Sequence, residues 1–161
     1  MQATDKMFYT SMFICDNFDV NTHTANNIIN KINTNDNLSA SFSMFMQIKC
    51  SEPALRKFDK LHCFLFLQNT SKLKLMLRFD VPNEGDNIKE NTFLNYMRIL
   101  EFDDYEFPDK GEYLWKLYVV KDEEYIQSIK PKCKDGSVLK LFRALNSEDH
   151  YLANISDLLV E

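Results

Sequence analysis

Glycine is scarce in this 161-residue sequence, which contains only Gly85, Gly111 and Gly136. Loops that bind nucleotide phosphates through backbone N–H groups need closely spaced glycines, as in the G-x-G-x-x-G and Walker A motifs. The three glycines are too far apart for either motif. Collagen-like sequences and glycine-rich linkers are excluded for the same reason.

Histidine and cysteine are also sparse, and their spacing forms no metal-binding motif. The chain has three histidines and four cysteines, which lie far apart: His23, His62, His150, Cys15, Cys50, Cys63 and Cys133. A zinc site needs ligands at short spacing. We therefore predict buried free thiols that pack as small apolar side chains. The alternative is a nucleophilic Cys15 activated by His23 or His62, which an expected strand around Cys15 disfavours.

The chain also has no net positive charge and no long apolar run. The formal net charge is −5, and this disfavours nucleic acid as a partner because a nucleic-acid binder normally presents a basic field. No apolar run approaches the roughly 20 residues that span a bilayer. The first residues do not have the pattern of a signal peptide. We expect a cytoplasmic protein with reduced thiols and no membrane partner.

Two segments alternate regularly between apolar and mostly polar residues. They cover residues 40–50 and 72–81, and in the second one face is apolar throughout between Leu73 and Val81. A period of two residues indicates a half-buried strand of an antiparallel sheet. A helix would instead distribute these apolar positions around its axis.

Further strands are expected where apolar runs are bounded by turn residues. We predict them at residues 8–18, 26–32, 61–67 and 111–120, with weaker candidates at 92–101 and 125–130. The run at 61–67 is apolar on both faces, which is typical of a central strand. The polar turn that follows it predicts a hairpin with the strand at 72–81.

The C-terminal segment has a different spacing. Ser147 is followed by two acidic residues, which is typical of the start of a helix. Leu152, Ile155 and Leu159 then repeat at intervals of three and four residues. This spacing predicts a short C-terminal helix at about residues 147–160.

The order of these elements predicts the fold class. About seven or eight strands at intervals of about ten residues are typical of an antiparallel β-sandwich. An α/β sheet is disfavoured because strand follows strand without a helix-length insert. We expect a mainly β protein with one domain over residues 1–161, in which the sandwich covers about residues 8–143 and the short C-terminal helix follows it.

Two short motifs carry a resemblance to known proteins. The first is F-I-C-D at residues 13–16, followed after a polar turn by N-I-I-N-K-I at 27–32, and the second is F-P-D-K-G-E-Y at 107–113. On these motifs, residues 8–132 resemble an uncharacterised bacterial family of small single-domain β-sandwich proteins. Asn30 stands where that family has a glycine. The resemblance implies a fold and no particular activity.

Acidic residues gather around the loop that precedes the predicted strand at 111–120. The candidate metal ligands among them are Asp103, Asp104, Glu106 and Asp109. Calcium binds six to eight oxygen ligands, and residues 83–87 and 122–124 would add more if they lay at the same end of the sandwich. The spacing matches no D-x-D-x-D-G loop, so a solvated acidic loop is the simpler interpretation. We expect no cofactor and keep calcium as the alternative.

Basic residues form two groups. The first lies on the strand at 72–81 and the second in the C-terminal third: Lys72, Lys74, Arg78, Lys130, Lys132, Lys134 and Lys140. Solvated strand faces and lysines that block a sheet edge explain both groups. A small patch that binds an anion or an acidic partner is the alternative.

Three aromatic residues fall on the nominally outer faces of their strands: Phe45, Phe64 and Phe66. Unless the C-terminal helix covers them, they form an exposed apolar patch, which is typical of a partner site. We therefore predict a non-enzymatic binding or adaptor module that contacts another protein or a second copy of itself. Two alternatives stay open: a metal-dependent or hydrolase-like enzyme built on the acidic loops, and an accessory protein of a phage or mobile element.

Overall fold

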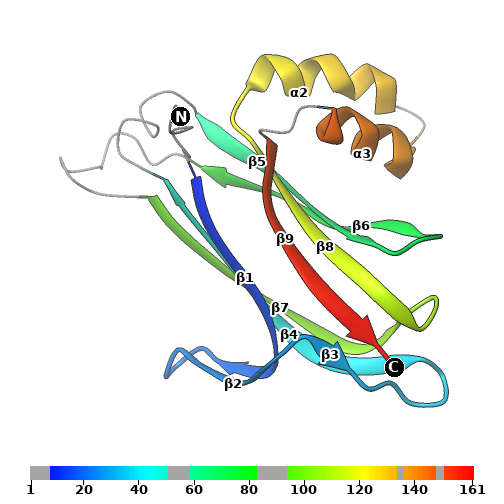
Figure 1. The fold of residues 1–161 in the computed structure, drawn as a ribbon. Helices are drawn as coiled ribbons and strands as arrows, with labels where there is room; N and C mark the ends of the chain where they lie inside the picture. Colours follow the sequence, from blue (N-terminus) through cyan, green and yellow to red (C-terminus); the bar gives the residue numbers. More distant parts are fainter. Residues whose placement is uncertain (1–7, 51–58, 83–93, 134–135, 148–150) are drawn as a thin grey trace, which may run out of the picture.

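The computed structural model describes residues 8–50, 59–82, 94–133, 136–147 and 151–161. Most of these residues lie in β-strands, which form two sheets that face each other, with two helices on the outside of one sheet (Figure 1). The mainly β fold predicted from the alternating sequence pattern is confirmed.

The first sheet has four strands in the order β2-β1-β4-β7, and every neighbouring pair is antiparallel. Its strands are β1 (Phe8–Asp19), β2 (Thr24–Ile29), β4 (Ser39–Cys50) and β7 (Leu94–Glu106). Strand β4 lies between β1 and β7 and pairs with both over most of its length.

The second sheet has five strands in the order β3-β9-β8-β5-β6. Its strands are β3 (Lys31–Ile32), β5 (Lys60–Gln68), β6 (Leu73–Pro82), β8 (Gly111–Val120) and β9 (Leu152–Val160). All pairs are antiparallel except the short parallel pair of β3 with β9. The predicted hairpin after residues 61–67 is confirmed as β5–β6.

The main core lies between the two sheets. Met44 and Met46 of β4 belong to one buried cluster with Leu65 of β5 and with Trp115 and Leu117 of β8. Each of these side chains is almost completely inaccessible to water. They occupy alternate positions on their strands because successive side chains of a strand point to opposite faces.

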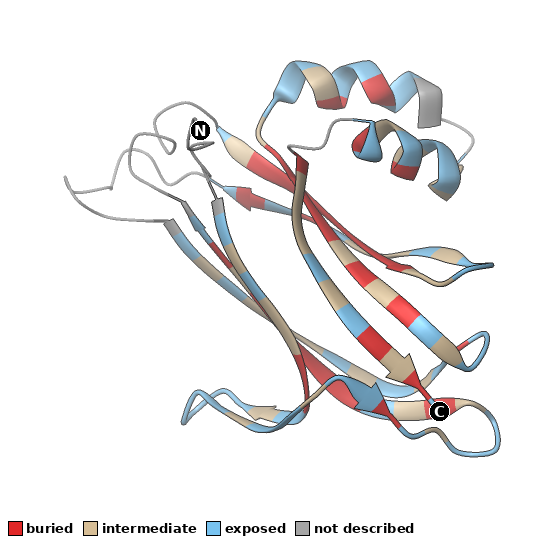
Figure 2. Ribbon diagram, in the orientation of Figure 1, coloured by how far each residue is buried: buried red, intermediate tan, exposed pale blue. Residues whose placement is uncertain are grey.

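Two helices cover the outer face of the five-stranded sheet. Helix α2 (Glu123–Ile129) begins after Asp122, whose side chain accepts a hydrogen bond from the backbone of Tyr125. The short 3-10 helix η2 (Lys130–Cys133) follows it, and helix α3 (Val138–Asn146) begins after Ser137. Figure 2 shows buried residues on the sides of both helices that face the sheet.

Two local predictions are wrong. Residues 125–130 were expected as a weak strand, but most of them belong to α2. Residues 152–160 were expected in a helix, but they form β9, which pairs with β8 and β3. A short helix does occur in the C-terminal third, as α3, and it ends before the predicted position. The backbone of β9 completes the sheet between β8 and β3, and this pairing outweighs the helical spacing of three side chains.

Candidate partner-binding surface

The three aromatic residues predicted as one patch lie on two different sheets. Phe64 and Phe66 are on the outer face of β5, where α2 and α3 cover them and leave them almost fully buried. The ring of Phe66 makes edge contacts with Tyr118 at 5.6 Å and with Phe142 at 5.3 Å. These two residues anchor the helices. Phe45 lies on the other sheet, on a face that no helix of the described residues covers.

Phe45 is the centre of an aromatic stack on the outer face of the four-stranded sheet. Its ring stacks on Phe13 with centroids 4.9 Å apart and on Phe18 with centroids 5.5 Å apart. Ile99 lies directly opposite Phe45 on β7, so both side chains share this face. All four side chains are only partly buried.

Exposed aliphatic side chains extend this stack on both sides. Ile28 of β2 pairs with Cys15 of β1 and is 67% exposed, and Met97 of β7 pairs with Gln47 of β4 and is 50% exposed. We call the outer surface of this sheet the open face, and its apolar members are Phe13, Phe18, Ile28, Phe45, Met97 and Ile99.

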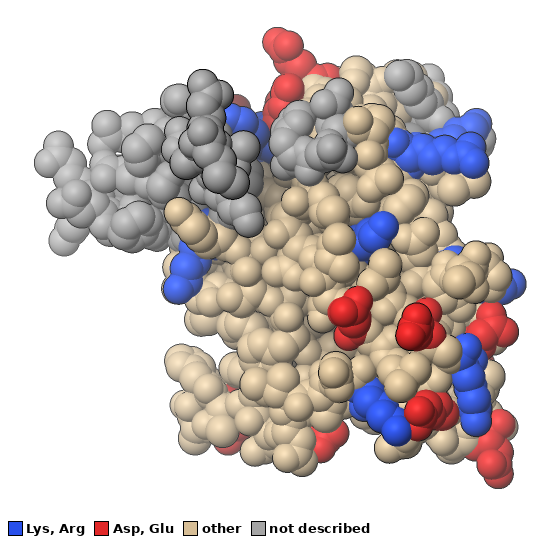
Figure 3. Space-filling view, in the orientation of Figure 1, with Lys and Arg blue, Asp and Glu red and all other residues tan. Residues whose placement is uncertain are grey.

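The open face differs from the outer face of the other sheet because no helix of the described residues packs on it (Figure 1). Between Ser43 and Lys49 of β4 and at the paired positions of β1 and β7, the residues that share this face with Phe45 include one cation, Lys49, and one anion, Glu101. Glu106, which pairs with Ser39, lies on the same face near its end. Figure 3 shows that acidic and basic side chains gather near the ends of β8 and β9, whereas the edge of the sandwich over β1 is largely uncharged. The open face is therefore an apolar surface with little charge on a chain of net charge −5.

The sequence alone did not single out most of this surface. Phe13, Phe18, Ile28 and Met97 lie on three strands, β1, β2 and β7, and the pairing order of the strands decides whether these side chains meet. The alternation within each strand shows which side chains share a face of that strand, but it does not show which strands are neighbours. For Ile28 the sequence did contain a signal. A polar turn joins the segments that form β1 and β2, and such a turn is typical of a hairpin that places Ile28 beside β1.

The four candidate metal ligands are all exposed. Asp103, Asp104 and Glu106 lie in β7, and Asp109 lies in the turn that follows. The backbone N–H of Asp104 donates to Ser41 Oγ at 3.0 Å beside an irregularity in the β4–β7 pairing. Residues 83–87 lie outside the described part of the chain. Within that part, no group of three or more His, Cys, Asp or Glu side chains could hold a metal ion.

His62 is buried between two carboxylates and not beside a nucleophile. Its Nε2 lies 2.6 Å from Oε2 of Glu123 at the start of α2, and its Nδ1 lies 3.2 Å from Oδ1 of Asp80. The Nδ1 contact lacks the alignment of a hydrogen bond and becomes an ion pair when the ring is protonated. Hydrogen bonds from Gln127 and His62 hold the pKa of Glu123 below its ordinary value. Cys15 lies on the other sheet, so His62 does not activate it.

The buried thiols should react slowly in the folded protein. Burial raises the pKa of both Cys15 and Cys63, and the charges of Asp16 and Asp80 add to this effect. Only the thiolate is nucleophilic, so little of either residue is reactive at neutral pH. We expect iodoacetamide followed by peptide mass mapping to label both residues only after denaturation. Rapid labelling of Cys15 in native protein would restore the nucleophile hypothesis.

Comparison with known proteins adds no assignment to this surface. Models of protein families give no match to the sequence, and neither do the curated proteins. The resemblance to a bacterial β-sandwich family therefore stays a prediction. Among the described helices, none has both the length and the apolar character to cross a bilayer.

Proposed function

We propose that this protein is a non-enzymatic binding module whose macromolecular interface is the open face. The observation that carries the proposal is that helices cover the outer face of one sheet, whereas no described helix covers the outer face of the other. On one sheet, α2 and α3 bury Phe64 and Phe66, whereas on the other the stack around Phe45 lies uncovered among exposed aliphatic side chains. Contiguous apolar surface of this kind is typical of an interaction site.

The partner that this surface fits best is a second copy of the chain. Lys49 and Glu101 lie toward opposite ends of the face, because Glu101 pairs with Ser43, six residues before Lys49 on β4. A two-fold axis between two such faces, crossing β4 near Phe45 and Gln47, reverses the strand direction of one copy relative to the other. It brings Lys49 of each copy toward Glu101 of the other, which gives a self-complementary contact.

The size of the face predicts a weak dimer. Six residues of β4 span about 20 Å, and four strands span about 14 Å across the sheet. This footprint is well below the roughly 800 Å² that each partner contributes to a standard interface. We therefore expect a dimer that dissociates on dilution.

The cytoplasm is the compartment we propose. Cys15 and Cys63 are both buried as free thiols, the state that a reducing compartment maintains. The alternative of a metal-dependent enzyme gains no support from the described acidic residues, which are exposed and do not converge.

A charge placed on the open face should abolish self-association. Met97→Lys and Ile28→Lys change exposed side chains, so folding stability should vary by only about 0.5 kcal/mol. Each places a lysine in the proposed interface, where desolvating an unpaired charge is costly. We expect light scattering with size-exclusion chromatography to show a concentration-dependent mass for the unmodified protein and a monomer for either variant.

The matched control is Leu139→Lys. Leu139 lies on α3 and is 48% exposed, close to the value for Met97, but it is remote from the open face. This variant has the same change of charge and should associate as the unmodified protein does. A protein that remains monomeric up to millimolar concentration, or a Met97→Lys variant that associates normally, contradicts the proposal.

A further inference from the structure

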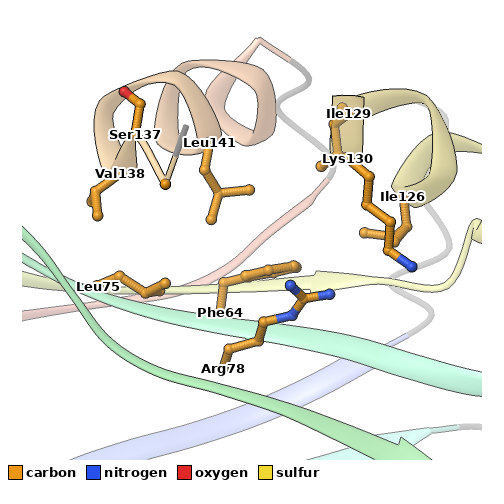
Figure 4. Close-up of a pocket in the computed structure, with 10 residues that line it drawn as sticks. Phe64, Leu75, Arg78, Ile126, Ile129, Lys130, Ser137, Val138 and Leu141 are labelled. Atoms are coloured by element: carbon orange, nitrogen blue, oxygen red, sulfur yellow. The ribbon is translucent and has the colours of Figure 1, made fainter. Parts of the chain in front are cut away.

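A pocket lies between the five-stranded sheet and the two helices that cover it. Its volume is about 190 Å³. Its floor is formed by β5 and β6 and its roof by α2 and α3 (Figure 4). The apolar side chains that line it are Phe64, Leu75, Ile126, Ile129, Val138 and Leu141.

Two cationic side chains complete the lining. Arg78 of β6 places its guanidinium carbon 5.3 Å from the centre of the Phe64 ring, and Lys130 extends from the end of α2. Figure 4 shows the guanidinium of Arg78 beside Phe64 on the floor of the pocket, and the side chain of Lys130 extending from the roof toward the floor. Both residues are exposed, and within the described part of the chain neither forms an ion pair with a carboxylate. No described lining residue is acidic.

The start of α3 adds a smaller contribution of the same sign. Gly136 and Ser137 line the pocket immediately before the first turn of this helix. Gly136 has a φ of 70°, a left-handed backbone that favours glycine. The N-terminal end of a helix carries a partial positive charge. The C-terminal end of α2, at Ile129 and Lys130, carries a partial charge of the opposite sign. The side chains of Arg78 and Lys130 are therefore what makes the pocket favour an anion on a chain that is acidic as a whole.

We propose that this pocket binds a small amphipathic carboxylate, with the carboxylate at Arg78 and Lys130 and the apolar body against Phe64 and Leu141. An apolar cavity of about 150 Å³ holds benzene, so the present volume suits a body of about six to eight carbons. The basic residues that the sequence placed in two separate groups meet here, one from each group. Arginine suits the role because its planar fork binds both oxygens of a carboxylate.

This site is independent of the proposed self-association. The pocket lies on the outer side of the five-stranded sheet, and the open face belongs to the four-stranded sheet. A monomeric protein could bind the carboxylate, and a dimer could lack the pocket ligand. The two proposals therefore fail separately.

Calorimetric titration of the full chain with sodium octanoate tests the proposal. Octanoate should bind with one site per chain, whereas acetate, which lacks the apolar body, and 1-octanol, which lacks the charge, should bind much more weakly. Arg78→Met and Lys130→Met keep most of the aliphatic stem and remove the charge. Each should weaken octanoate binding about tenfold or more, since a hydrogen bond to a charged group contributes about 1.5–3 kcal/mol.

Lys74→Met is the matched control. Lys74 is an exposed cation on the same strand as Arg78, but it lies over the ring of Tyr105 and does not line the pocket. This variant should bind octanoate normally, and octanoate should raise its melting temperature as it does for the unmodified protein. The proposal is overturned if octanoate does not bind at millimolar concentration or if octanol or acetate binds equally well. Normal binding by Arg78→Met, or weakened binding by Lys74→Met, overturns it too.

Discussion

Replacing Phe66 with alanine should lower the free energy of unfolding by about 3–5 kcal/mol, the usual cost of truncating a buried phenylalanine. The side chain is fully buried between the sheet and the helices, in edge contact with the rings of Tyr118 and Phe142. Its loss leaves a cavity beneath Phe142 of α3. Since small domains are stable by about 5–15 kcal/mol, urea denaturation followed by circular dichroism should show a large fall in the midpoint.

Phe18→Ala provides the comparison on the other sheet. Phe18 is only partly buried, and its ring stacks on the ring of Phe45 on the open face. Its truncation removes little buried surface in the monomer and should cost much less than Phe66→Ala. If the two variants lost equal stability, the open face would have to be covered in the folded chain, and the distinction between the two outer faces would not hold.

The two outer faces of the sandwich have different roles in this interpretation. One face is covered by α2 and α3, and this cover encloses a pocket that Phe64, Leu75, Ile129 and Leu141 help to line. The other face is largely apolar at its centre, and no helix of the described residues covers it. A cover made by the chain itself suits a small ligand, whereas an open sheet face suits another protein surface.

The strands could be predicted from the sequence because a strand that is buried on one face has apolar residues at every second position. Strand β4 shows this with Met44 and Met46 in the core. In β6 the expectation of one apolar face from Leu73 to Val81 is wrong. Leu77, Phe79 and Val81 pack in the main core, whereas Leu73 and Leu75 pack under the helices, beyond an irregularity in the β5–β6 pairing. The grouping of Phe45 with Phe64 could not be tested in this way. It depends on which sheet each strand joins, and that is decided by pairing between segments far apart in the chain.

The helical cover had a sequence signal that the strand pattern obscured. Ser137 precedes Val138, Leu141, Phe142 and Leu145, an N-cap followed by apolar residues at intervals of three, four and seven. In the structure, Phe142 and Leu145 are buried and belong to one cluster with Phe64 and Phe66 of the sheet. Helix α2 gave a weaker signal, because seven residues are too few to separate a helical period from an alternating one.

The C-terminal segment allows the sharpest test of strand against helix. In β9, Leu158 faces the core and is 1% exposed, whereas Ile155 pairs with Lys116 on the outer side and is 50% exposed. A helix with Leu152, Ile155 and Leu159 on its buried face would reverse the importance of positions 155 and 158. The two positions therefore report which structure the segment adopts.

Leu158→Ala should lower the free energy of unfolding by about 2–5 kcal/mol, and Ile155→Ala should change it by only about 0.5 kcal/mol. The first removes a side chain that packs with Tyr113 and Val160 in the main core, and the second shortens one that already contacts water. Both variants introduce alanine into the same strand, at positions three residues apart. The strand propensity of the new residue is therefore the same in both. Urea denaturation of the pair decides the matter, and a larger loss for Ile155→Ala than for Leu158→Ala would show that the segment is not the strand that joins β8 to β3.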